Sequence, residues 1–299
     1  MKVRVEKQIG EQVFSLETGK LAKQAAGACL AQYGETVVLA AATTGPARPG
    51  TDFFPLTCDY RERTAAAGKF PGGFLKREGR PTLKEVLSSR LIDRPIRPLF
   101  PEWFRDEVQI QCMVLSSDRQ QDGDVLAINA AAASLGLSPT PFAAPLAAVR
   151  LGRVDGRLIP FPTQDDLEES DLDLVVAGNY KSVMMIEGFA REMPEDEMAA
   201  CIMEAHRYVC QLCDLQQELY EKVGVVKAQY EIPADDGLFD RLRENYYETF
   251  KQVKQTPGKQ ARAEAVRELR ERVQAELIPD PEAEGAISLA AFNKAWHDL

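Results

Sequence analysis

Hydrophobic and polar positions alternate through much of residues 1–115, the pattern of half-buried β-strands. The segments with this pattern, or with a short apolar run of similar length, are residues 3–9, 12–16, 36–43, 53–60 and 108–115. The first two segments flank Gly10-Glu11 and therefore predict a hairpin. Residues 18–33 differ, because they are rich in alanine and place apolar residues on one helical stripe before Gly34. They predict a helix.

The middle of the chain mixes strands with helices. Strands are predicted at residues 145–154 and 157–162, which form a hairpin around Asp155-Gly156, and at residues 172–177 and 182–187, which form a pair. Helices are predicted at residues 124–135 and 195–223. Each of the two helices ends at a glycine, Gly136 and Gly224, as helices commonly do. Strands and helices mixed in this way predict an α+β fold.

The last part of the chain changes character. A linker containing Pro233 leads to three segments of helical periodicity, residues 238–254, 259–277 and 287–298. We therefore expect two domains, an α+β domain over residues 1–226 and a small all-helical domain over residues 227–299.

Composition places the chain among cytoplasmic globular proteins. Its net charge is −10, and 45% of its residues are hydrophobic. No apolar run approaches the roughly 20 residues of a membrane span, and the N-terminus lacks a signal-peptide core. We expect the six cysteines to be reduced, and no membrane contact.

One basic window stands out in this acidic chain. Residues 61–105 hold eleven Lys or Arg and five Asp or Glu, so the window carries +6 and the rest of the chain −16. Phe70, Phe74 and Phe100 lie among these cations. Cations interleaved with aromatic rings are typical of single-stranded nucleic-acid sites. Two alternatives remain for Phe74, a ring tucked into the core or an exposed platform for a base.

The basic window reads as a glycine-rich loop followed by a helix. Thr82 and Glu85 have the spacing of a capping box, which predicts a helix from Thr82 to residue 91 or 92 and an exit broken by two prolines. Arg90 and Arg94 lie four apart and share a face if the helix continues. Arg97 follows, with Asp93 as a candidate partner.

Three segments resemble one known family. The segment GGFLKREGRPTLKEVLSSRLIDRPIRPLFP closely resembles the signature of the polynucleotide phosphorylase family, and TDFFPLTCDYRERTAAAGKFPG and FPTQDDLEESDLDLVVAGN fit the same pattern. The resemblance implies that residues 1–226 form a first ribonuclease PH-like (ribosomal protein S5 domain 2-like) domain. It implies that residues 227–299 form the family's helical linker domain. The family's second ribonuclease PH-like half and its KH and S1 domains have no counterpart here, so we expect an N-terminal part of a longer enzyme.

The resemblance also implies an activity. The family degrades single-stranded RNA processively from its 3′ end, using inorganic phosphate and Mg²⁺ and releasing nucleoside diphosphates, as a ring-shaped homotrimer with partners in RNA-degradation complexes. The residues that it implies for RNA binding are Phe74, Lys76, Arg77, Arg80, Arg90 and Arg94, with Arg97 as a substrate-phosphate contact. The family usually has two aromatics and two arginines at the loop tip, whereas Leu75 and Lys76 replace one of each here.

The residues for chemistry are missing from the matching positions. Where the family's catalytic domain has a Gly/Ser-rich phosphate turn, this chain has Asp122 and Asp124, which we interpret as acids that cap the following helix. Asp173 is in register with the family's metal-binding Asp, but Val175 replaces the Lys two residues later. We expect no catalytic residue in this half, and Asp173 is only a weak metal candidate.

Two further readings stay open. The chain is either a non-enzymatic, RNA-gripping ring scaffold or a self-sufficient phosphorolytic exoribonuclease resembling ribonuclease PH. His206, Cys210 and Cys213 share a helical face, for which core packing is favoured over a metal site. The sequence shows no nucleophile triad, P-loop or dinucleotide fingerprint.

Overall fold

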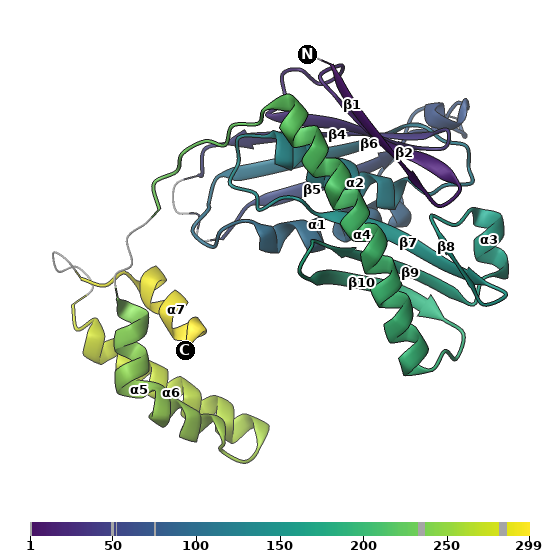
Figure 1. The fold of residues 1–299 in the computed structure, drawn as a ribbon. Helices are drawn as coiled ribbons and strands as arrows, with labels where there is room; N and C mark the ends of the chain where they lie inside the picture. Colours follow the sequence, from purple (N-terminus) through teal and green to yellow (C-terminus); the bar gives the residue numbers. More distant parts are fainter. Residues whose placement is uncertain (1, 49–50, 52, 75, 233–236, 281–285) are drawn as a thin grey trace. The chain divides into compact units, whose positions relative to one another are not determined.

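The computed structural model describes residues 2–48, 51, 53–74, 76–232, 237–280 and 286–299 (Figure 1). The chain forms two compact units, Met1–Tyr230 and Glu231–Leu299. The first unit contains two β-sheets and four α-helices among its described residues, and the second contains three helices. No helix in the described ranges is both long enough and apolar enough to span a membrane.

The larger sheet has six strands in the order β1-β2-β3-β4-β6-β5. Its strands are β1 (Val3–Ile9), β2 (Gln12–Thr18), β3 (Gly27–Tyr33), β4 (Thr36–Gly45), β5 (Leu56–Glu62) and β6 (Glu107–Ser116). Neighbouring strands are antiparallel except β5 and β6, which are parallel. A parallel pair needs a crossover. Here the crossover contains the 3₁₀ turn η1 (Thr64–Ala67), the basic loop, α1 (Leu83–Ile96) and a second 3₁₀ turn, η2 (Arg97–Leu99).

The smaller sheet has four antiparallel strands in the order β10-β9-β7-β8. Its strands are β7 (Ala147–Val154), β8 (Arg157–Pro160), β9 (Leu172–Gly178) and β10 (Val183–Ala190), with the short helix α3 (Gln164–Glu169) between β8 and β9. The long helix α4 (Glu195–Val223) packs on β7, β9 and β1. The predicted hairpin, strand pair and long helix of this region are confirmed.

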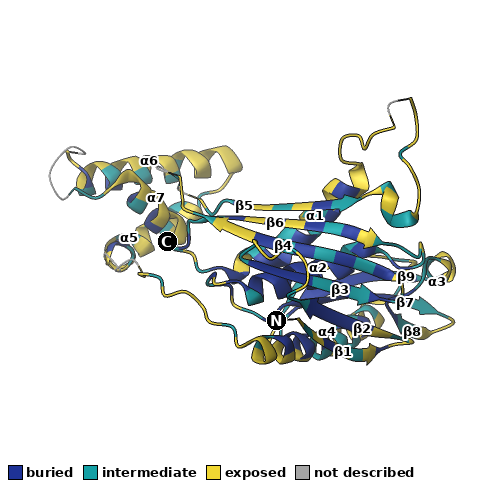
Figure 2. Ribbon diagram, turned by 90° about the horizontal axis from the view of Figure 1, so that it is seen from above, coloured by how far each residue is buried: buried dark blue, intermediate teal, exposed yellow. Residues whose placement is uncertain are grey.

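Helix α2 (Gly123–Leu137) joins the two sheets, because it packs against β3 and β4 of one and β7 of the other. Nearly all of its residues are buried, as the dark blue of α2 in Figure 2 shows. Its many alanines let both sheets approach closely. Fully buried Asn129 fixes the packing, since its amide donates to Val125 O and Ala148 O and accepts from Ala148 N.

The predicted helix over residues 18–33 is wrong, because Gly27–Tyr33 is strand β3. A Cβ on Gly27 would lie 2.0 Å from Ser134 O of α2, so this strand needs small residues to touch the helix. A strand that is buried against a helix needs small residues, and such a strand therefore has the same alanine-rich composition as many helices. This composition is the reason for the wrong prediction.

Two other local predictions need correction. Helix α1 does not end at residue 91 or 92 but continues through Pro95 to Ile96, because Ile92, Pro95 and Ile96 are buried against the sheet. The short helix α3 is absent from the predicted elements, although Thr163 caps it in a capping box with Asp166. For α1 tertiary packing, and for α3 the N-terminal cap, outweighs the intrinsic preferences of the residues.

The second unit is a bundle of α5 (Leu238–Lys254), α6 (Lys259–Leu277) and α7 (Leu289–Asp298), close to the predicted helices. Its core is small and includes Leu242, Val273, Phe292 and Trp296.

The first unit extends four residues beyond the expected end at Val226. Tyr230 packs on Trp103 and Phe104, and Ala228 N donates to Pro139 O. Lys227 Nζ also donates to three backbone carbonyls at the end of α2, and burial lowers its pKa to about 8.

Candidate functional site

The loop before α1 projects from the first unit with its functional candidates exposed. Phe74 is 98% exposed, so its ring is not tucked into the core. Lys76, Arg77 and Arg80 are exposed, and none of them forms an ion pair or side-chain hydrogen bond with another described residue. In Figure 2 this segment is an almost unbroken yellow trace that leads into α1. Leu75, which the resemblance singled out, lies outside the described residues.

Hydrogen bonds to two carboxylates hold the base of the loop. Glu78 Oε1 accepts from the backbone N and the Oγ1 of Thr64, at 3.0 and 2.9 Å. Glu85 closes the predicted capping box with Thr82 and also accepts from Glu62 N at 2.9 Å. Burial raises the pKa of Glu85, but hydrogen bonds from the backbone of Thr82 and Glu62 outweigh it and hold the pKa below its ordinary value. The loop is therefore anchored at its base and open at its tip.

Two of the three arginines predicted on and after α1 face solvent. Arg90 is exposed and has no ion-pair partner among the described residues. Arg94, half exposed, pairs through Nη1 with Glu187 Oε2 on β10. A single exposed ion pair contributes about 0–1 kcal/mol, so Arg94 can exchange Glu187 for a phosphate at small cost.

Arg97 is engaged by its own chain. Its guanidinium donates to both oxygens of Asp93 and to the carbonyl oxygens of Phe54 and Leu56, at 2.8–3.2 Å. It also lies 5.8 Å from the centroid of the Phe54 ring. These contacts connect η2 to the start of β5 and give Arg97 a structural role, whereas its phosphate contact stays a prediction.

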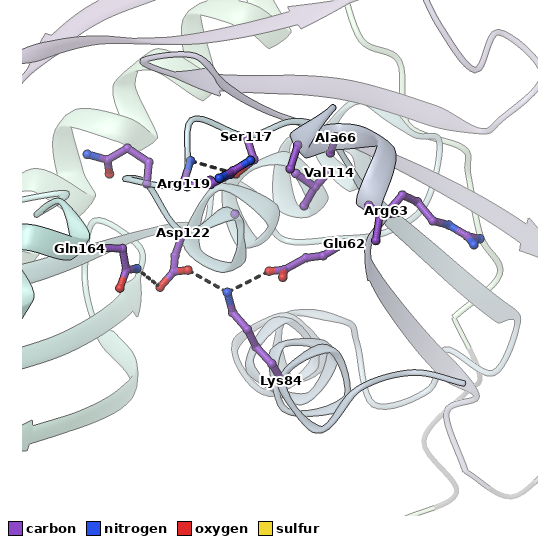
Figure 3. Close-up of a pocket in the computed structure, with 13 residues that line it drawn as sticks. Glu62, Arg63, Ala66, Lys84, Val114, Ser117, Arg119, Asp122 and Gln164 are labelled. Atoms are coloured by element: carbon purple, nitrogen blue, oxygen red, sulfur yellow. Dashed lines mark hydrogen bonds and ion pairs between the residues drawn. The ribbon is translucent and has the colours of Figure 1, made fainter. Parts of the chain in front are cut away.

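A cavity of about 540 Å³ opens between the loop base and the start of α2. Figure 3 shows Lys84 of α1 between two carboxylates, with Nζ 3.1 Å from Glu62 Oε1 and 2.8 Å from Asp122 Oδ1. Gln164 Nε2 donates to Asp122 Oδ2 at 2.9 Å. The remaining polar and basic lining residues include Arg63, Thr64, Ser117, Arg119 and Gln121.

Next to this cavity, three carboxylates surround one guanidinium. Arg150 of β7 places Nη1 2.6 Å from Asp122 Oδ2 and 3.8 Å from Asp124 Oδ2. Its Nε and Nη2 each donate to one oxygen of Asp173 on β9, both at 2.7 Å. The Arg150 side chain is only 17% exposed. The cluster therefore contains its own cation.

The electrostatics of the cluster follow from this arrangement. Burial raises the pKa of Asp122, but Lys84 and Arg150 outweigh it and hold the pKa below its ordinary value. Burial, and then the charge of Asp122, raise the pKa of Asp124. Burial acts to lower the pKa of Arg150, but its carboxylate partners raise it above the ordinary value. The guanidinium and Asp122 are therefore charged, while Asp124 is the carboxylate that resists ionisation.

The predicted capping of α2 by acids is wrong for Asp122, whereas Asp124 in the first turn accepts a hydrogen bond from Val125 N at 2.7 Å. Asp122 occupies the N-cap position of α2, but its side chain makes no capping hydrogen bond and binds Lys84, Arg150 and Gln164 instead. The next residue, Gly123, is buried under Tyr60, where an added Cβ would lie 2.7 Å from the phenol oxygen. The turn nevertheless lines the cavity described above, through Gln121, Asp122 and Gly123.

The metal candidate Asp173 is likewise engaged, because both of its oxygens accept from Arg150. Val175, at the position where the resemblance implies a Lys, is 5% exposed on β9. Among the described residues, no group of three or more His, Cys, Asp or Glu side chains is arranged to hold a metal ion. On the face of His206, Cys210 and Cys213, where the sequence favours core packing, Cys213 is buried, whereas His206 and Cys210 are half-buried. His206 Nε2 lies 2.8 Å from Asn179 O.

Sequence reasoning missed Arg150, Lys84 and Arg119. Arg150 is a single arginine within the largely apolar strand β7, and a buried arginine needs charged partners. This position could have indicated its role from the sequence. The grouping of aromatics also needs correction. Phe100 is 7% exposed and belongs to the core, whereas Phe70 is 91% exposed and stays with the loop.

Two family models match the first unit. The model described as "3′ exoribonuclease family, domain 1" matches residues 12–141, and the model described as "3′ exoribonuclease family, domain 2" matches residues 144–208. The first match covers β2 to α2 and the second covers β7 to the first half of α4, so the two together include every strand of both sheets except β1.

Similar proteins extend over the whole chain. A polyribonucleotide nucleotidyltransferase of Rhodopirellula baltica is 60% identical over 298 residues, which are 100% of this chain and 40% of that protein. One of Sorangium cellulosum is 43% identical over 296 residues, 99% of this chain and 39% of that protein. The chain thus spans about 40% of the length of these relatives.

Solved structures share the fold. Rice Rrp46 superposes with a TM-score of 0.56 at 15% identity, covering 72% of this chain and 96% of that one. A chain of the Archaeoglobus fulgidus exosome with RNA bound to the active site gives a TM-score of 0.52 at 15% identity, covering 75% and 88%.

Proposed function

This chain belongs to the 3′ exoribonuclease family, and on that premise we propose that it supplies the RNA-gripping half of a phosphorolytic 3′-to-5′ exoribonuclease. The reaction of the whole enzyme is that of a polyribonucleotide nucleotidyltransferase. Inorganic phosphate attacks the last phosphodiester phosphorus of single-stranded RNA, and the bond to the 3′ oxygen of the preceding nucleotide breaks. That oxygen takes up a proton, and a nucleoside diphosphate leaves.

One observation carries the proposal for this half, the exposed and unpaired tip of the loop. Phe74 is 98% exposed in a chain of net charge −10, beside cations that have no partner in the described structure. An exposed ring offers a face to one base, worth about 1–3 kcal/mol. Lys76, Arg77 and Arg80 supply the charge for the phosphates on either side, although Lys76 lacks the bidentate fork of an arginine.

The α1 arginines extend this surface. We assign Arg90 and Arg94 to RNA phosphates, because Arg90 is unpaired in the described structure and Arg94 has only the exposed Glu187 as partner. Arg97 is kept as a weaker phosphate candidate, since its donors already serve Asp93 and two carbonyl groups.

The carboxylate cluster does not fit a magnesium ion. Mg²⁺ prefers ionised carboxylate oxygens, but both oxygens of Asp173 bind Arg150 and the pKa of Asp124 is raised. We therefore assign no catalytic residue to this half. Mg²⁺ and inorganic phosphate act, in our proposal, in another part of the enzyme. This argument favours a binding half over a self-sufficient exoribonuclease.

The family membership supports the rest of the assignment. We propose a homotrimeric ring that threads single-stranded RNA, acts in mRNA degradation in the cytoplasm, and meets the partners of an RNA-degradation complex. A basic surface within an acidic chain suits such a ring, because the RNA is attracted at one place and repelled elsewhere.

Binding of a fluorescein-labelled oligo(A), followed by anisotropy, tests the loop assignment. Phe74→Ala with Arg77→Ala should weaken binding by about 10- to 100-fold and lower the salt slope by about 0.7. The matched control, Tyr180→Ala with Arg207→Ala, removes an exposed ring and an exposed cation outside the loop. Equal affinity of the loop variant and the parent chain would sink the assignment.

The same preparation tests the division of labour. With poly(A), inorganic phosphate and Mg²⁺, the 299-residue chain should bind RNA but release no ADP. Steady ADP release that disappears in Asp173→Ala would establish the self-sufficient enzyme instead.

A further inference from the structure

A second basic surface lies in the helical unit. Residues 249–263 contain four Lys or Arg and no Asp or Glu. We call these four residues the basic tip, and they are Lys251, Lys254, Lys259 and Arg262. Together with the window over residues 61–105, this segment leaves the remainder of the chain at −20.

The fold gathers the four cations at one end of a helical hairpin. Lys251 and Lys254 belong to the last turn of α5, whereas Lys259 and Arg262 lie at the start of α6. Helices α5 and α6 pack against each other and are joined by the short turn at residues 255–258, as Figure 1 shows. Cations from both helices therefore surround the turn, and all four are exposed.

The charges of the basic tip are not compensated within the described chain. None of the four cations forms an ion pair there, and Lys254 has only the Phe250 ring, 5.0 Å away at its centroid. Farther along α6, by contrast, Arg267 pairs with Glu264 and Glu271.

The helix dipoles act differently on the four cations. Lys251 and Lys254, in the last turn of α5, are favoured by the dipole of that helix, whereas Lys259 at the start of α6 is opposed by its own. Within each helix the two cations lie three positions apart and repel each other. A strongly basic surface without ion-pair partners in the described part of an acidic chain matches an external polyanion.

We propose that the basic tip is a second contact for single-stranded RNA, through its phosphodiester backbone. Three of the four cations are lysines, which act as point charges on phosphates and read no base. The exposed turn at residues 255–258 has no exposed aromatic ring for stacking, so binding there is independent of base identity. The proposal rests on the proposed RNA-degrading function.

The test replaces all four cations by glutamine in the full chain and measures oligo(A) binding by anisotropy across a salt series. Four phosphate contacts contribute about 2.8 to the salt slope, so the slope should fall by about that amount. Affinity at low salt should fall at least about ten-fold. Affinity for oligo(A) and for oligo(U) should fall equally.

A control variant removes the same number of charges from exposed, ion-paired positions. Its substitutions are Arg4→Gln, Arg207→Gln, Lys222→Gln and Arg267→Gln. An equal loss of affinity in this control would reduce the effect to net charge and overturn the proposal. Unchanged RNA binding in the variant with all four tip cations replaced would also overturn the proposal. An acidic protein would then be the next partner to test.

Two double variants control for misfolding of the fourfold variant. One replaces Lys251 and Lys254 by glutamine, and the other replaces Lys259 and Arg262 by glutamine. Each should lower the slope by about half as much as the fourfold variant. The Phe74→Ala, Arg77→Ala variant separates this proposal from the loop assignment. If it binds normally while the tip variants bind weakly, the loop assignment fails and the basic tip stands. The opposite result overturns the basic tip alone.

Discussion

The cations of the loop and the cations of the carboxylate cluster are the same residue types in opposite settings. Lys76, Arg77 and Arg80 are exposed and have no partner in the described structure. Arg150 and Lys84 are held by Asp122, and Arg150 also by Asp173, at 2.6–2.8 Å. The first group can bind a ligand, whereas the second group already binds carboxylates of the same chain.

The neighbours of a cation, and not its residue type, therefore decide whether it can bind a ligand. Arg150 supplies from within the protein the positive charge that a metal ion would bring to three carboxylates. A buried charge that loses its partner is expensive, so such a cluster is locked. The cations of the exposed loop break no ion pair of the described structure when they turn to a phosphate.

The largest effect should come from breaking the cluster. Arg150→Met leaves Asp122, Asp124 and Asp173 without their shared cation and should lower the free energy of unfolding by about 3–5 kcal/mol. Urea denaturation followed by circular dichroism measures this loss. Arg157→Met is the control, since Arg157 is exposed and has no ion pair in the described chain. A loss in Arg150→Met no larger than in the control would contradict the locked cluster.

A smaller effect, of opposite sign, is expected at Asp124. Because its pKa is raised in the folded state, this carboxyl favours folding below its unfolded pKa, and that contribution is lost as pH rises through the folded pKa. Asp124→Asn should therefore stabilise the protein at pH 7 by about 0.5–1 kcal/mol.

The ionisable groups around Asp124 are Asp122, Arg150, Lys84 and the phenol of Tyr60, so the gain in stability of Asp124→Asn reflects their balance of charge. Urea denaturation at several pH values checks it. The gain of Asp124→Asn should shrink as pH falls toward about 4, the ordinary value for Asp. A gain that is constant with pH would show that ionisation of Asp124 is not its cause.

The smallest effect concerns the base of the loop. Glu78→Ala removes the acceptor of both Thr64 hydrogen bonds and should weaken oligo(A) binding by about three-fold, since a freer loop loses more entropy on binding. The free energy of unfolding should change by less than about 0.5 kcal/mol, because Glu78 is exposed. Glu78→Gln, which keeps one acceptor oxygen, should restore most of the affinity. Weak binding in both variants would assign Glu78 a role other than holding Thr64.

Local signals predicted much of the fold. Residues close together in the sequence predict the Thr82 capping box, the strand pair of the smaller sheet and the end of α4 at a glycine. The structure contains each of these features. A helix is predicted over residues 27–33, which form a strand, because a strand packed against α2 needs small side chains and a run of small side chains also favours a helix. The loop was predictable as a basic, aromatic site, but its exposure was not.

The position of the positive charge, most of the helices and strands, and the positions that differ from the catalytic residues implied by the resemblance could be predicted from the sequence alone. Which cations lack a partner in the described structure depends on contacts between distant parts of the chain. Arg150 meets Asp122 and Asp173 across 28 and 23 positions of sequence, and no local pattern encodes such a meeting. The packing of α2 between the two sheets brings these groups together, and burial then makes their pairing costly to break.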